Sequence, residues 1–164
     1  MAHFDSLIEQ KERLRAALLN NQTVVNLLVN TGNNMVEFDQ IKTGSKSPAA
    51  KLVKTHFYVP RTTTEDQNFI TMRGRVVYAD TDVVKETMLI VYVICNEDQI
   101  DLLQGSRADL IANEIDKILN KNEPLFGLGG IELSTADEVQ FTEGYSGWEI
   151  PFATHEMNRD ANRL

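Results

Sequence analysis

The side chains that could ligate a metal or attack a substrate are three histidines and one cysteine in a chain of 164 residues. His3, His56 and His155 lie far apart, and none has a second ligand at the spacing of a helical metal site. Cys95 ends the most apolar stretch of the chain, which favours a small buried hydrophobic residue over a thiol nucleophile. We therefore expect no metal site and no catalytic residue, and a lone cysteine excludes an intrachain disulfide.

Two short segments resemble ligand-binding loops but lack essential residues. Residues 127–130 read Gly-Leu-Gly-Gly, yet no Lys-Ser/Thr pair follows them, so a turn is favoured over a phosphate loop. Residues 96–101 are acidic but lack the central glycine and the terminal glutamate of a calcium loop. We expect no cofactor, and a small enzyme without a recognisable motif stays as an alternative.

The charge of the chain is distributed unevenly. Sixteen Lys and Arg against 24 Asp and Glu give a net charge of -8, which argues against general DNA coating. Residues 40–75 carry seven basic and two acidic side chains, for +5, whereas residues 76–156 carry four basic and sixteen acidic ones, for -12. The seven basic residues, which we take as a candidate interface or DNA-facing arm, are Lys42, Lys46, Lys51, Lys54, Arg61, Arg73 and Arg75.

This basic segment has two interpretations. Lysines in a loop can simply keep it solvated. Alternatively, the segment is an arm that docks onto an acidic surface, either a neighbouring copy in a ring or the phosphates of DNA in a lumen. Since no aromatic residues are interleaved with the loop lysines, a stacking platform for single strands is disfavoured.

The spacing of apolar residues predicts helices over residues 5–20 and 106–120. A short helical continuation over 23–29 follows a break near Asn20-Asn21. Residues 39–56 place Gly, Ser and Pro among lysines, which predicts a long exposed basic loop.

The strand signals lie mainly in the middle and at the end of the chain. Residues 68–79 and 83–95 predict an antiparallel hairpin with a turn at 80–82. The latter half of the second strand is apolar on both faces, so we expect it to be central and covered on both sides by helices or a neighbouring subunit. Further candidate strands are 56–59, 131–133, 138–142 and 148–153.

These elements predict an α+β fold, with a mostly antiparallel β-sheet flanked by two main helices and a long basic loop. We expect one domain over residues 1–155 and a polar C-terminal tail over 156–164. The longest strongly apolar run, residues 88–95, is too short to span a bilayer. The N-terminal residues lack the features of a secretory signal, so we expect a soluble protein with no membrane partner.

Three segments of the second half stand out: residues 107–119 of the predicted helix, the Gly-rich turn and strand at 127–133, and the segment Tyr-Ser-Gly-Trp-Glu-Ile-Pro-Phe at 145–152. Together they resemble the neck proteins of tailed bacteriophages, most nearly the tail terminator (tail completion or head–tail joining) family. The resemblance covers residues 84–155 and leaves the 39–56 loop unmatched.

The resemblance implies a structural protein without catalysis. Such a subunit forms a ring, typically a homohexamer, which ends the tail tube and meets the head connector or a head-completion protein. The expected location is the neck or tail of the virion, after assembly in the host cytoplasm. The alternatives are a head-closure or tail-tube protein, and the small enzyme named above.

Overall fold

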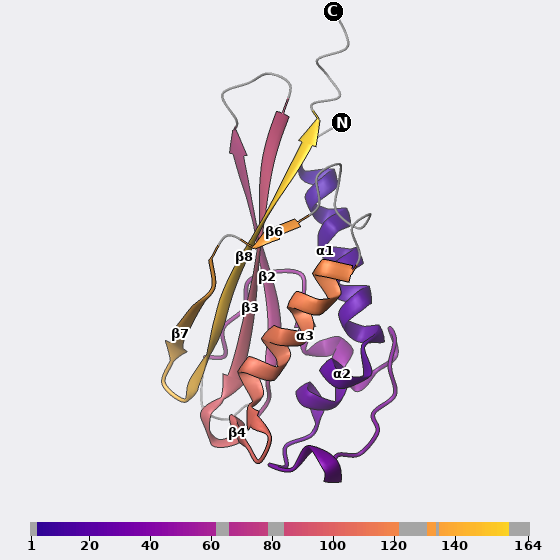
Figure 1. The fold of residues 1–164 in the computed structure, drawn as a ribbon, viewed down its shortest axis with the longest axis vertical. Coiled ribbons are helices and arrows are strands. Elements are labelled where there is room, and N and C mark those ends of the chain that lie inside the picture. Colours follow the sequence, from indigo (N-terminus) through magenta and orange to yellow (C-terminus); the bar gives the residue numbers. More distant parts are fainter. Residues whose placement is uncertain (1–2, 62–65, 79–83, 122–130, 134, 158–164) are drawn as a thin grey trace, which may run out of the picture.

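The computed structural model describes residues 3–61, 66–78, 84–121, 131–133 and 135–157. Within these residues a six-stranded sheet carries three α-helices on one of its faces (Figure 1). The larger elements are α1 (His3–Asn20), α2 (Gln22–Val29), β2 (Phe69–Tyr78), β3 (Val84–Asn96), α3 (Arg107–Lys121), β7 (Asp137–Thr142) and β8 (Tyr145–Met157). The smaller ones are η1 (Met35–Glu37), η2 (Pro48–Lys51), β1 (Val53–Lys54), η3 (Glu97–Gln99), β4 (Asp101–Leu102), β5 (Gly105–Ser106) and β6 (Ile131–Leu133).

Strand β3 lies at the centre of the sheet, whose order is β1-β2-β3-β8-β6, with β7 also paired to β8. It pairs with β2 from Phe69↔Ile94 to Tyr78↔Lys85, and with β8 along its whole length. These pairings are antiparallel, as are those of β6 and β7, while β1 and β2 are parallel. The predicted α+β class with a mostly antiparallel sheet is therefore confirmed, and the predicted central position of β3 is correct.

The alternation of side chains divides the sheet into two different faces. Leu89 and Val91 of β3, with Ile150 and Phe152 of β8, are buried on the face that the helices cover. Gly74 of β2 also belongs to this face, because a Cβ there would overlap Leu7 of α1. The side chains of the residues that flank Gly74 in β2 therefore point to the opposite side of the sheet, which we call the outer face.

The predicted break between the first two helices is confirmed, and Asn21 explains it. Its side-chain oxygen accepts a hydrogen bond from Val24 N at 3.0 Å and so caps the start of α2. Its amide nitrogen donates to Glu114 of α3 at 3.3 Å. The sheet is thus flanked by three α-helices in the described residues rather than the two main helices we expected.

The prediction of an exposed loop over residues 39–56 is wrong for its second half. Ser47 caps η2 through Ala49 N at 3.1 Å, and Ala49, Leu52 and Val53 are buried. Arg15 of α1 donates to the carbonyl oxygens of Ala50 and Val53, at 2.8 and 3.0 Å. The segment lies against the helices because Arg15 of α1 donates to two of its backbone carbonyl oxygens, a tertiary effect that loop composition does not reveal.

The boundaries of three further elements also differ from the prediction. Residues 56–59 form no strand, because β1 ends at Lys54 and the chain then crosses the outer face. Strand β8 extends to Met157, so the predicted polar tail begins inside the sheet, and its remainder lies outside the described residues. The predicted turns at 80–82 and 127–130 lie outside them as well. None of the described helices has the length and apolar content needed to cross a bilayer.

Gly147 of β8 lies close to the backbone of β3. A Cβ at this position would lie 1.9 Å from the carbonyl oxygen of Val93. We expect Gly147→Ala to lower the free energy of unfolding by about 2–3 kcal/mol, because the strand must shift to relieve the overlap. Urea denaturation measures the change. The matched control is Gly32→Ala, where the nearest atom is 3.8 Å away and the expected change is below about 0.5 kcal/mol. Equal effects of the two substitutions would contradict the overlap argument.

Candidate assembly surfaces

The seven predicted basic residues fall into two groups in the structure. Lys42, Lys46 and Lys51 are exposed on the segment that lies against α1 and α2, where Gly44 N donates to Leu19 O at 2.8 Å. Lys54, Arg73 and Arg75 belong to the outer face, because Lys54 pairs with Thr71 and both arginines alternate with Gly74. Arg61 is exposed and follows the stretch that crosses this face. The structure thus divides the predicted basic arm between two surfaces.

Aromatic residues cover the lower part of the outer face. Tyr92 of β3 lies 4.7 Å from Phe57 and 5.9 Å from Phe141, measured between ring centroids. Tyr58 lies 5.4 Å from Phe69 in the same way, and the Lys54 ammonium sits 4.7 Å above the Tyr58 ring. This lysine therefore has a cation–π partner and is less free to bind another surface than an unstacked lysine would be.

A charged pair flanks the Tyr92 hydroxyl on this face. The hydroxyl donates to Glu149 Oε1 at 3.3 Å. Burial, followed by the negative charge of Glu149, raises the pKa of Tyr92, while Arg73 works in the opposite direction. Tyr92 therefore stays protonated near neutral pH and can hold its hydrogen bond to the carboxylate.

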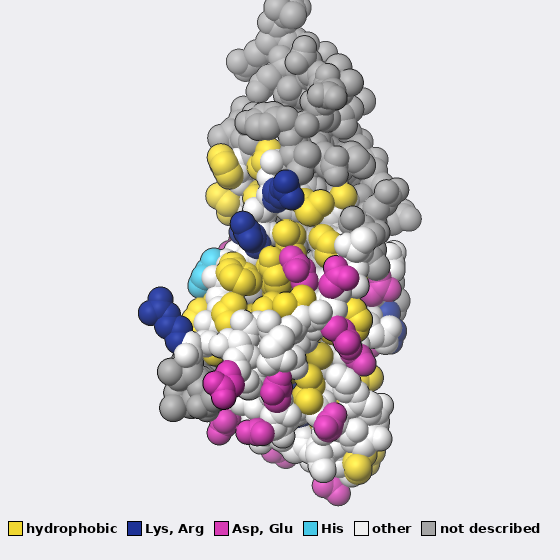
Figure 2. Space-filling model, turned by 90° about the vertical axis from the view of Figure 1, so that its left-hand side faces the viewer, with side chains coloured by type: hydrophobic (Ala, Val, Ile, Leu, Met, Phe, Trp, Pro, Cys, Tyr) yellow, Lys and Arg dark blue, Asp and Glu magenta, His cyan; other side chains and the backbone are white. Residues whose placement is uncertain are grey.

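The upper part of the outer face is basic and partly apolar. Arg73 and Arg75 are exposed there, and Met88 and Pro151 are half-buried beside them in the register of β2, β3 and β8. Figure 2 shows hydrophobic side chains from the upper part to the middle of this side of the molecule, with Lys and Arg among them and at the left edge, and Asp and Glu mainly from the middle downward. The expectation that β3 is covered on both sides thus holds only in part within this chain.

A groove runs between α3 and the strands β7 and β8 on the helix side of the sheet. It comprises two adjoining hollows of about 240 and 210 Å³, which share Asp109 and Trp148. We call it the tryptophan groove and define it by Asp109, Ala112, Asp116, Glu138, Trp148 and Ile150. Trp148 is half-buried, and its indole N–H donates to Asp109 Oδ1 at 2.7 Å.

The size and the charge of its lining residues decide what the groove exposes. Ala108 and Ala112 face it from α3, and these small side chains leave the indole partly uncovered. Its charged lining residues are Asp109, Asp116 and Glu138, and the described residues that line it include no Lys or Arg. The groove therefore combines a mainly polar hollow with a mainly apolar one, and carboxylates line both.

Two exposed apolar side chains lie at the lower end of the molecule. Val36 in η1 is 85% exposed, and Leu103 between β4 and β5 is 72% exposed. Hydrogen bonds hold their two turns together. Leu103 N donates to Asn33 O at 2.8 Å. The side-chain amide of Gln104 donates to Asn34 Oδ1, and its oxygen accepts from Met35 N. We call this surface the apolar end. Its flanking segments, 31–39 and 96–106, contain five acidic residues and no basic ones.

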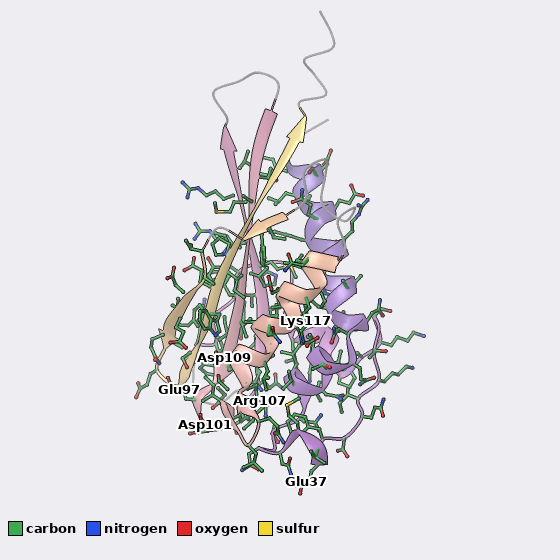
Figure 3. The ribbon with its side chains drawn as sticks, in the orientation of Figure 1. Glu37, Glu97, Asp101, Arg107, Asp109 and Lys117 are labelled. Carbon is green, nitrogen blue, oxygen red and sulfur yellow. The ribbon has the colours of Figure 1, made fainter. Side chains whose placement is uncertain are left out.

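The buried guanidinium of Arg107 fixes the apolar end to the body of the protein. Its side chain is 0% exposed and donates to four backbone carbonyl oxygens. These are Gln99 O at 2.9 Å, Asn30 O and Gly32 O at 2.8 Å each, and Leu27 O. Figure 3 shows Arg107 at the start of α3, with Glu37, Glu97 and Asp101 around it at this end.

The sequence analysis missed Arg107, although one signal was present. A cation in the first turn of a helix opposes the helix dipole, so an arginine there suggests a tertiary role. In the structure the carbonyl groups at the end of α2 stabilise the charge, and the Phe38 ring lies 5.4 Å from the guanidinium carbon. Burial nevertheless lowers the pKa of Arg107.

The comparison with known proteins places the chain in a family. The YomW family matches residues 21–154, which include the outer face, the tryptophan groove and Arg107. The chain belongs to the YomW family. The family is phage-associated, in agreement with the broader part of the resemblance to phage neck proteins, and the match does not specify tail termination. No curated protein matches the chain.

The reactive side chains of this YomW-family chain are not gathered into a site in the part that the structure describes. Cys95 is fully buried, and burial raises the pKa of its thiol to about 12, so the thiol is neutral near pH 7. His56 is exposed, whereas the side chains of His3 and His155 lie outside the described part. The described residues contain no group of three or more metal-ligating side chains.

Arg107 should contribute more to stability than any exposed cation of this chain. Replacing it with Met leaves four carbonyl oxygens without their donor, so we expect Arg107→Met to lower the free energy of unfolding by about 3–5 kcal/mol in urea denaturation. Arg107→Lys keeps the charge but not the planar set of donors, and its cost should be intermediate.

The control is Lys117→Met on the same helix. Lys117 is exposed and bound only to Glu114, so the change should be within about 0.5 kcal/mol. If Arg107→Met proved as mild as this control, the carbonyl cluster would have no structural role.

Proposed function

We propose that this chain is a structural virion protein, a subunit of a ring that terminates the phage tail tube and joins it to the head connector. The observation that carries the proposal is the separation of charge between two surfaces on opposite sides of the sheet. Arg73 and Arg75 mark the basic outer face, and Asp116 and Glu138 mark the acidic groove. Unlike surfaces on identical copies associate head to tail, and such contacts close into rings when the rotation permits.

The partners follow from the same proposal. Copies of the chain form the ring, which we propose to be a hexamer like those of the family it resembles. Along the ring axis, one side meets the tail tube protein and the other meets the head connector or a head-completion protein. The apolar end suits an axial contact because the exposed Val36 and Leu103 are held in fixed turns.

The exposed lysines of the 39–52 segment have a separate role in this proposal. Lys42, Lys46 and Lys51 extend from a segment anchored on α1 and α2, so their charges are available to a partner. They would bind an acidic protein surface or, without sequence preference, the phosphates of DNA in the lumen. The chain would assemble in the host cytoplasm and remain in the neck or tail of the virion, with no membrane contact.

A structural role fits Asp109 of the groove and the Cys95 thiol better than a catalytic one. Asp109, which lines the groove, accepts a hydrogen bond from the indole N–H of Trp148. The Cys95 thiol is buried and neutral. A general acid or base needs a titratable group that is free to exchange a proton with a substrate, and neither residue offers one.

Binding to tail tubes tests the proposed function. Purified chain is mixed with tubes assembled from the tail tube protein of the same phage, and the mixture is examined by sedimentation and negative-stain microscopy. We expect ring-shaped density at the tube end and native mass spectra with a closed oligomer. A strictly monomeric chain that never associates with tubes would contradict the proposal. Binding to head connectors alone would favour a head-closure protein instead.

The exposed lysines should affect assembly and not folding. We expect replacement of Lys42, Lys46 and Lys51 by Ser to weaken tube binding and its salt dependence, while the melting temperature stays nearly unchanged. Lys54 is left intact because its ammonium stacks on the Tyr58 ring. A control with Arg13→Ser and Lys117→Ser removes two exposed cations from helices and should leave binding unchanged. Equal salt dependence in the triple variant and the native chain would rule out the electrostatic contribution.

A further inference from the structure

We propose that the tryptophan groove of one copy binds the upper outer face of the next copy, and that this contact is the repeating interface of the ring. The inference rests on the proposed ring and identifies the two surfaces that meet. The occupant of the groove is thus a second copy of this chain, with Arg73 and Arg75 against the carboxylates and Met88 and Pro151 against the indole.

The groove has the properties of a binding site for a protein surface. Trp148 is fixed by its hydrogen bond to Asp109 at 2.7 Å, so little conformational freedom is lost when a partner covers the indole. Ala112 and Ile150 extend the apolar area beside it. Partly exposed tryptophan in a preformed hollow is the kind of residue that dominates binding energy at protein interfaces.

The outer face supplies side chains whose charge and apolar character match those of the groove. Arg73 and Arg75 alternate on one strand, so their guanidinium groups lie on the same side of β2. Met88 of β3 and Pro151 of β8 are half-buried on that same side, as the strand registers place them. Arginine and methionine are enriched at interface cores, and arginine can bind a carboxylate through two parallel hydrogen bonds.

The charges of the two surfaces favour a second copy of this chain as the occupant of the groove. The groove lining has three carboxylates and no cation, and the upper outer face has two exposed arginines. Two grooves would repel each other, and so would two outer faces, which disfavours a symmetric dimer. Because the two surfaces lie on opposite sides of the sheet, each copy can bind one neighbour through its groove and another through its outer face.

Two variants, each altered on one surface, test the interface. The groove variant carries Ala112→Arg and Glu138→Lys, and the face variant carries Arg73→Glu and Arg75→Glu. Each variant alone should bind its own copies at least ~10-fold more weakly than the native chain does, in native mass spectrometry and sedimentation. A 1:1 mixture should form heterodimers, since the groove variant still has a native face and the face variant still has a native groove.

The matched control for the groove variant carries Glu12→Lys and Asn113→Arg. It changes the net charge by the same +3 at exposed helical positions outside the groove and should assemble like the native chain. If Ala112→Arg prevents folding, Glu138→Lys with Gln140→Lys repels the same partner from exposed positions of β7. Circular dichroism confirms that each variant is folded.

The outcomes separate this inference from the proposed function. Native-like assembly of either surface variant, a mixture that stays monomeric, or a native chain that is monomeric at all concentrations would overturn the interface. Variants that still form rings on tail tubes would leave the function standing without this interface. Heterodimers from a chain that never binds tubes would support the interface and contradict tail termination.

Discussion

The buried charge of Arg107 is the constraint on which the lower half of the molecule depends. An arginine taken out of water is tolerated only where other groups replace its hydration. Here four carbonyl oxygens do so, from the end of α2, the turn after it and the segment before α3. The side chain thereby joins three stretches of backbone that share no β-pairing.

This connection also sets the position of α3 relative to the sheet. Arg107 begins the helix, and Asp109 lies two residues later beside Trp148 of β8. The helix therefore approaches the sheet at a fixed point, and its alanines, rather than larger side chains, face β8 there. A groove with an uncovered indole results from a helix that is held in place but not packed closely along its whole length.

The sequence predicted the elements of this fold better than the way they contact one another. Periodicity identified α1, α3, β2 and β3, because each has a long apolar face with a regular repeat. It did not identify β1, which has two residues and owes its strand conformation to the edge of β2. The 39–56 segment was misjudged because its burial depends on Arg15, 35 and 38 residues away from the carbonyl groups it binds.

For the candidate surfaces, too, the sequence predicted which residues are present better than how the fold brings them together. The excess of basic residues over 40–75 was visible in the sequence, but its division between the helix side and the outer face depends on strand register. The strand that carries Trp148 was predicted at 148–153 from the alternation of its residues. The hollow beside Trp148 was not predicted, since it requires knowing that Ala108 and Ala112 of α3 face β8. Arg107 carried only the signal of an unfavourable helix position.

The length of β8 has a consequence for the order in which the protein folds. This C-terminal strand pairs with β3 along all thirteen of its residues and provides the only attachment of β6 and β7 to the sheet among the described residues. During synthesis β3 is made before its partner β8, and pairing between segments so far apart in the sequence forms slowly. Trp148 and Ile150 arrive with the same strand, so a nascent or truncated chain lacks the groove floor. Incomplete subunits are thereby kept from any assembly that requires this groove.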